Sequence, residues 1–150
     1  MASSLITNVS HIGVCVSDLE RSLRFYCDIL GFVVSSTVPE VRVEGEPSDS
    51  LLQLRDVKLH AVYLERDGFR LELLHYASPR SPAKAPQRAM NDLGFTHLSV
   101  KVTDVEATLA QLEAAGVTVD RATVIQVGGL TVAGFVRDPD GLGIELVIAH

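Results

Sequence analysis

Two histidines and two glutamates occupy matching places in the two halves of the chain, and both residue types bind metals. His11 and His97 each follow a hydroxyl residue, and they are 86 positions apart. Glu72 and Glu145 each lie between apolar residues, in the triplets Leu-Glu-Leu and Ile-Glu-Leu. Two imidazoles and two carboxylates at one point suit Zn, Ni, Co, Mn or Fe(II), with positions left open for water or substrate. The repeat therefore predicts one divalent metal site.

The two halves match well beyond these four residues. Residues 10–20 read SHIGVCVSDLE, and residues 96–106 read THLSVKVTDVE, at the same offset of 86. The segments around the glutamates, DGFRLEL and DGLGIEL, also match, but at an offset of 73. The first half is therefore longer between its histidine and its glutamate. We expect the extra residues in the polar, proline-containing stretch Thr37–Asp56.

Each half is predicted to fold as a β-α-β-β-β unit. Alternating apolar residues from Val9 to Val16 indicate a first strand. Ser17 and Thr103, each with a glutamate three positions later, predict the N-caps of two helices, which glycines end. Further strands are expected at Phe32–Ser36, Lys58–Arg66 and Phe69–Tyr76 in the first half, and at Val117–Ile125, Thr131–Asp138 and Gly143–Ala149 in the second.

The domain organisation follows from the chain length and the position of the prolines. We expect a single α+β domain, residues 1–150, because this length is ordinary for one hydrophobic core. Its two modules should span about 7–77 and 93–149. Three prolines interrupt any helix or strand ladder in the segment between them, so residues 78–92 are predicted to be a linker.

The amino-acid composition limits the kinds of partner that we expect. With 47% apolar and 21% charged residues the chain is an ordinary globular protein, and its net charge of −6 disfavours nucleic acid or an anionic membrane. No apolar run approaches the roughly 20 residues of a membrane span, and we see no secretory signal. Two cysteines are too few for a disulfide framework. We expect a cytoplasmic protein that acts on a small molecule.

Strand alternation gives a test of the metal hypothesis. Side chains alternate faces along a strand, so ligands near strand middles in a duplicated unit should face one shared concave surface. His75 has the opposite parity to Glu72 and is predicted to face away from that surface. His60, on the preceding strand, is predicted to lie at a cavity wall or at the surface.

On these residues the chain resembles the vicinal oxygen chelate superfamily, which includes glyoxalase I, bleomycin resistance proteins and extradiol dioxygenases. The resemblance covers about Ser10 to Ile148. The segment Asp18–Phe32 is similar to the family's signature helix, and Asp138–Leu146 resembles its final hairpin and strand in glyoxalases. In that family, paired β-α-β-β-β modules form a curved mixed sheet around a metal. The resemblance thus implies His11, Glu72, His97 and Glu145 as the metal ligands.

The resemblance further implies a metal-dependent lyase or isomerase of the glyoxalase I type. A divalent metal would bind two neighbouring substrate oxygens, and proton transfer would proceed through a metal-stabilised enediolate. Glu145 is expected to be the base and Glu72 its pseudo-symmetric counterpart. Family analogy also implies a homodimer, with the ligands supplied by one chain or by two.

Three alternatives remain open at this point. His11, His97 and Glu145 alone would make the facial triad of an Fe(II) extradiol dioxygenase, with a residue such as His60 for acid–base chemistry. The second alternative is an epimerase of an acyl-CoA, although the epimerases that this chain resembles commonly carry glutamine at one of the two glutamate positions. The third is a non-catalytic binding or resistance protein, but such relatives lack the ligands.

Overall fold

The structure is a computed structural model that describes residues 5–81 and 89–149 of the chain. These fall into two compact units, Met1–Pro82 and Ala83–His150. Residues 82–88, which belong to the predicted linker, lie outside the described residues. No helix in the described part of the chain is long and apolar enough to cross a bilayer.

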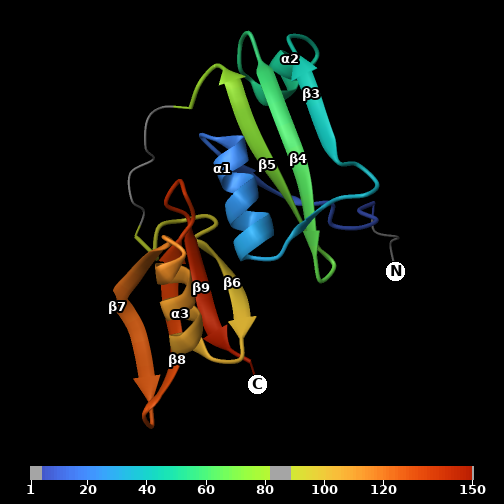
Figure 1. The fold of residues 1–150 in the computed structure, drawn as a ribbon. Coiled ribbons are helices and arrows are strands. Elements are labelled where there is room, and N and C mark those ends of the chain that lie inside the picture. Colours follow the sequence, from blue (N-terminus) through green and yellow to red (C-terminus); the bar gives the residue numbers. More distant parts are fainter. Residues whose placement is uncertain (1–4, 82–88, 150) are drawn as a thin grey trace. The chain divides into compact units, whose positions relative to one another are not determined.

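The first unit is a five-stranded mixed sheet with a helix across one face (Figure 1). Strands follow the order β1-β5-β4-β2, and β3 also pairs with β4. Strands β1 and β5 are parallel, and the other pairs are antiparallel. The elements are β1 (Ile12–Cys15), α1 (Leu19–Leu23), η1 (Arg24–Ile29), β2 (Val33–Val34), β3 (Glu40–Glu44), α2 (Ser48–Leu52), β4 (Lys58–Arg66) and β5 (Phe69–Ser78).

Alternation along β4 and β5 places neighbouring side chains on opposite faces of the sheet. Leu64 and Leu73 are fully buried, as is Tyr26 of η1, the π-helical continuation of α1. The neighbouring Tyr63 and Glu72 point to the opposite face. The sheet therefore buries Leu64 and Leu73 on one face, while the face of Tyr63 and Glu72 carries polar side chains together with an apolar cluster around Leu59.

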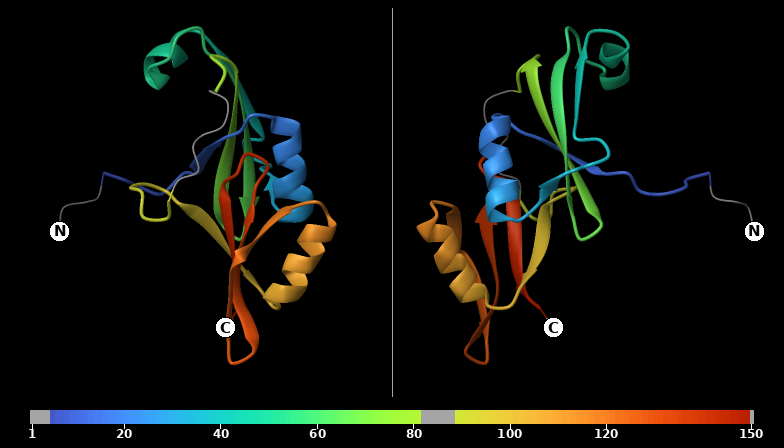
Figure 2. Two further views of the ribbon diagram at one scale, coloured as in Figure 1. Left: turned by 90° about the vertical axis from the view of Figure 1, so that its left-hand side faces the viewer. Right: turned by 45° about the vertical axis from the view of Figure 1, so that its right-hand side comes forward.

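The second unit repeats this plan with four strands (Figure 2). Its strand order is β6-β9-β8-β7, and α3 packs on one face of the sheet. Leu109 of the helix and Val136 and Ile144 of the strands are fully buried. Gly134 lets the helix approach, because a Cβ there would lie 3.2 Å from Leu109. The elements are β6 (His97–Val102), α3 (Val105–Ala114), β7 (Thr118–Val127), β8 (Leu130–Arg137) and β9 (Gly143–Ile148).

The α+β class and the mixed sheets are confirmed, but the stretch Thr37–Asp56 is more ordered than predicted. It contains β3 and α2. Strands β2 and β3 pair with successive parts of the same edge of β4, as two pieces of one interrupted strand. Strand β7 is continuous, but its pairing with β8 shifts register between Asp120 and Ile125. Both units are therefore β-α-β-β-β, with α2 added to the first.

The helix caps lie one residue later than predicted. Asp18, not Ser17, caps α1, and its carboxylate accepts a hydrogen bond from the Arg21 amide at 2.9 Å. Asp104, not Thr103, caps α3 in the same way. Both aspartates also fit the rules for an N-cap, and a carboxylate gains from the positive end of the helix dipole.

Candidate metal centre

Each unit brings its own histidine and glutamate together. Strands β1 and β5 are parallel neighbours, so the His11 Nε2 lies 3.0 Å from the Glu72 carboxylate. Strands β6 and β9 repeat this pairing, and the His97 Nε2 lies 3.5 Å from the Glu145 carboxylate. The duplicated sequence has thus produced two equivalent His/Glu pairs.

A hydroxyl group fixes the ring of each histidine from the other side. The Ser10 Oγ lies 2.9 Å from the His11 Nδ1, and the Thr96 Oγ1 lies 2.8 Å from the His97 Nδ1. Because Nδ1 is engaged, Nε2 is the nitrogen presented to the glutamate. This is how outer groups commonly orient a metal-binding histidine.

An aromatic ring packs against each histidine. The Tyr63 ring meets the His11 ring edge to face, with centroids 5.3 Å apart, and Phe135 meets His97 in the same way at 5.5 Å. Tyr63 stands opposite Glu72 in the sheet register, as Phe135 stands opposite Glu145. Each aromatic residue therefore borders both members of its pair.

Tyr63 differs from Phe135 in carrying a hydroxyl, and hydrogen bonding with the Glu72 carboxylate is among the causes that raise the pKa of Tyr63. Burial, followed by this hydrogen bond, raises the pKa of Tyr63 to about 12. The phenol therefore stays protonated and remains a donor at neutral pH.

The geometry of each pair fits two ligands of one divalent ion. Ligand atoms about 2.1 Å from a common ion, at angles between octahedral and tetrahedral, lie about 3.0–3.4 Å apart. The separation of 3.0 Å in the first pair falls within this range and that of 3.5 Å in the second lies just above it, and the side chains keep between 14% and 30% of their surface exposed. Within residues 5–81 and 89–149, no group of three or more metal-binding side chains gathers at one point. Each unit on its own thus supplies half of the predicted ligand set.

A cation lies beside the second pair. Arg137 is opposite Gly143 in the sheet, and a Cβ built at Gly143 would be 3.3 Å from its guanidinium and 3.5 Å from the His97 Cβ. Asp120 accepts a hydrogen bond from Arg137 at 3.1 Å, which holds the side chain in place. The guanidinium is therefore positioned on the face that carries Glu145.

The other two histidines considered from the sequence do not join the first pair. His75 has the predicted parity, and its Nδ1 lies 3.3 Å from the Val16 carbonyl oxygen. His60 stands opposite His75 in the register, and its Nε2 lies 2.7 Å from Glu40. That contact comes first among the causes that lower the pKa of Glu40. His60 is thus on the face opposite Glu72, whereas Tyr63 lies on the same face as Glu72.

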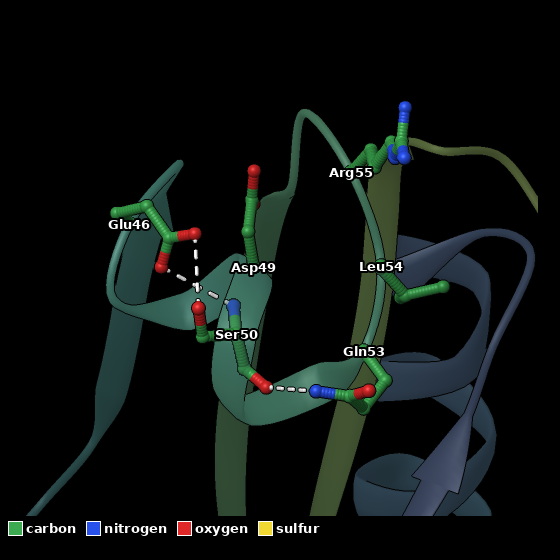
Figure 3. Close-up of a pocket in the computed structure, with 6 residues that line it drawn as sticks. All are labelled: Glu46, Asp49, Ser50, Gln53, Leu54 and Arg55. Carbon is green, nitrogen blue, oxygen red and sulfur yellow. Dashed lines mark hydrogen bonds between the residues drawn. The ribbon is translucent and has the colours of Figure 1, made fainter.

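Two hollows in the first unit lie outside the pairs. One, of about 310 Å³, is lined by residues of α2 and of the segments on either side of it (Figure 3). There the Glu46 carboxylate accepts hydrogen bonds from Ser50, and the Gln53 side chain donates one to the Ser50 carbonyl. The other, of about 460 Å³, lies at the β4–β5 turn and includes Ser10 among its lining residues. None of the four predicted ligands lines either hollow.

Tyr63, Phe135 and Arg137 are the functional candidates that sequence reasoning missed. The signal was present for Tyr63, because the two-residue turn Asp67-Gly68 fixes the β4–β5 register. Counting back from Glu72 across that turn leads directly to Tyr63.

The fold and the pairs together define a class of α+β proteins built from two β-α-β-β-β units. Within this class, the chain belongs to the Glyoxalase/Bleomycin resistance protein/Dioxygenase superfamily, whose family model matches residues 8–146. The resemblance predicted from the sequence is therefore confirmed.

Similar curated proteins extend over nearly the whole chain. The uncharacterized protein YaeR of Escherichia coli (strain K12) is 32% identical over 143 residues, covering 94% of this chain and 95% of that protein. A probable lactoylglutathione lyase of Synechocystis is 29% identical, with 91% and 92% covered. The lactoylglutathione lyase of Haemophilus influenzae is 27% identical, with 93% and 90% covered.

Solved structures with similar folds include several glyoxalase family proteins. The glyoxalase I of Leishmania major, described as trypanothione-dependent, has a TM-score of 0.63 at 27% identity, covering 92% of this chain and 84% of that one. A glyoxalase family protein from Bacillus cereus has the same fold, with a TM-score of 0.79 at 19% identity and 99% and 97% coverage. So does the fosfomycin resistance protein FosX of Listeria monocytogenes, solved with Mn(II) and sulfate, at 0.59, 16% identity and 97% and 95% coverage.

Proposed function

We propose that the two His/Glu pairs together bind one divalent cation, and that the protein is a glyoxalase-type lyase or isomerase. The observation that carries this proposal is the equivalence of the pairs, with donor separations of 3.0 and 3.5 Å that suit a common ion. The ligands would be His11, Glu72, His97 and Glu145. A bound divalent ion would supply Lewis acidity toward two neighbouring oxygens of the substrate.

The chain's own residues would then carry out the proton transfer. The Glu145 carboxylate would take the hydrogen from the hydroxyl-bearing carbon of the adduct and return it to the neighbouring carbonyl carbon through an enediolate, while the hydroxyl proton passes to the former carbonyl oxygen. For the adduct of a thiol and a 2-oxoaldehyde, the product is a 2-hydroxyacyl thioester. This is an isomerisation, so it requires no oxidant, reductant or second substrate.

The surroundings of Glu145 suit such a step. Arg137 places a cation on the same face, where negative charge develops on the substrate oxygens. Phe135 packs edge to face on His97 and lies opposite Glu145, so it borders both members of the pair. The relatives named lactoylglutathione lyase make a glutathione adduct the first substrate to test.

The test is turnover of the hemithioacetal of methylglyoxal and glutathione by protein loaded separately with Zn, Ni, Co, Mn or Fe(II). We expect thioester formation without oxygen uptake. Glu145→Gln should lower kcat by about 10²–10⁴-fold, the range for loss of a general base, with bound metal still measurable. His60→Gln, on the opposite face, is the matched control and should retain activity.

Other results would redirect the proposal. Wild-type turnover in metal-loaded Glu145→Gln rules out its role as the base. Catechol-dependent oxygen consumption with Fe(II) would indicate a dioxygenase, and a protein that takes up none of the five metals would indicate a binding protein.

A further inference from the structure

The two His/Glu pairs differ in one respect that bears on which glutamate transfers the proton and which remains a fixed ligand. Histidine rings, aromatic packing and strand register match in the two units. The residue opposite Glu72, however, is Tyr63, and the residue opposite Glu145 is Phe135. Only the first unit has a hydroxyl at this place.

The carboxylate opposite that hydroxyl is the more restrained of the two. Glu72 lies 3.0 Å from His11 and directly opposite Tyr63, whose ring packs on His11, so two side chains border it. Its side chain is also the less exposed, at 14% against 26% for Glu145. Glu145 has the longer contact with its histidine, 3.5 Å, and faces a phenyl ring that cannot donate.

A glutamate that transfers a proton must be able to turn toward the substrate, whereas a fixed ligand need not. We propose that Tyr63 is a positioning residue that keeps Glu72 in place as a permanent ligand and so leaves proton transfer to Glu145. This inference rests on the proposed function, and it explains how two pseudo-symmetric carboxylates acquire different roles.

The reciprocal substitutions Tyr63→Phe and Phe135→Tyr exchange the hydroxyl between the units. Tyr63→Phe should free Glu72, so that Tyr63→Phe/Glu145→Gln turns over about tenfold faster than Glu145→Gln alone, the effect of a hydrogen bond to a charged group. Phe135→Tyr should restrain Glu145 and lower kcat by about the same factor with little change in KM. A purely structural role for Tyr63 would instead make the double variant slower than Glu145→Gln.

A second readout does not depend on turnover. Calorimetric titration with Mn²⁺ should show Tyr63→Phe binding the ion about 10–100-fold more weakly than wild type, the usual effect of removing an outer hydrogen bond to a ligand. Tyr76→Phe is the matched control, because Tyr76 lies on the same face of β5 and packs in the apolar cluster around Leu59. Its Mn²⁺ affinity should equal that of the wild type.

The outcomes separate this inference from the function on which it rests. If wild-type protein binds Mn²⁺ but Tyr63→Phe binds it equally well, or if the double variant is no faster than Glu145→Gln, the role assigned to Tyr63 is overturned and the metal site stands. If wild-type protein binds no divalent ion, both are overturned. Circular dichroism of every variant verifies that a loss does not come from unfolding.

Discussion

Removing the hydroxyl that engages each histidine ring should weaken ion binding by an amount that can be worked out in advance. Ser10 and Thr96 each contact a histidine Nδ1, at 2.9 and 2.8 Å. Loss of such an outer contact typically costs 10–100-fold in metal affinity. Both histidine side chains are about 30% exposed, since their values are 30% and 28%, and water can replace part of the lost contact. We therefore expect the lower end, about tenfold or 1.4 kcal/mol, for Ser10→Ala and for Thr96→Val.

The double variant Ser10→Ala/Thr96→Val tests whether one ion is held by both pairs. If one ion is held by both pairs, each ring contributes separately, and the losses should multiply to about a hundredfold in Ser10→Ala/Thr96→Val. Calorimetry with Mn²⁺ or Zn²⁺ measures all three variants. Ser50→Ala removes a comparable exposed hydroxyl on α2, which donates to Glu46, and should leave the affinity unchanged.

The pattern of losses decides whether both units bind the ion. A single variant that retains wild-type affinity, while the other loses it, would mean that one pair alone holds the metal. Wild-type affinity in both would refute the orienting role of the hydroxyls. Either result contradicts the reasoning from the two equivalent pairs.

Three further predictions concern the units themselves. Asp104→Ala should lower the unfolding free energy by about 1 kcal/mol, because it removes a helix cap, and Thr103→Ala should change it far less; equal losses in urea titrations would contradict the cap assignment. Gly134→Val should destabilise by about 1–3 kcal/mol, because α3 already lies within contact distance, and an unchanged melting temperature would contradict this packing. The hydroxyl of Ser35, and then an adjacent guanidinium, lowers the pKa of Glu65 below its ordinary 4.5. Its stabilisation is therefore present above that value and lost as pH falls through the lower folded-state pKa, so Glu65→Gln should destabilise at pH 7 and become neutral at strongly acidic pH.

The pairing of histidine with glutamate could be predicted because it depends on local repetition. A strand that begins at the histidine and a strand centred on the glutamate recur in both halves, and equivalent strands adopt equivalent places. Neighbouring parallel strands then bring His11 to Glu72 and His97 to Glu145. The joining of all four around one ion remains a prediction, because no repeat within a unit determines it.

The strand β3 was missed although its pattern is clear in retrospect. Val41 and Val43 alternate with charged residues through Glu40–Glu44, which is the period of a strand with one apolar face. Pro39 and Pro47 flank this segment and favoured a loop. The prolines interrupt the edge strand only at its ends, where the loss of a backbone donor is tolerated.

The orientation of Tyr63 was missed for a different reason. Strand parity alone says which residues share a face within one strand, but not which residues of two strands are opposite. The turn Asp67-Gly68 supplies that register, and a register count would have placed Tyr63 against Glu72. Long-range placement thus follows from turn geometry as much as from hydrophobic pattern.

In the first unit, the strands that position His11 and Glu72 lie away from the connection that carries the added residues. The strands next to His11 and Glu72 are β1 and β5, on one side of the sheet, whereas the added residues 45–57 join β3 and β4 on the other. In the second unit the corresponding connection is the short turn Gly128-Gly129. Insertions and deletions can therefore accumulate at the far edge through evolution without shifting the strands that carry the histidine and the glutamate, so the length of this connection can vary while each His/Glu pair keeps its place.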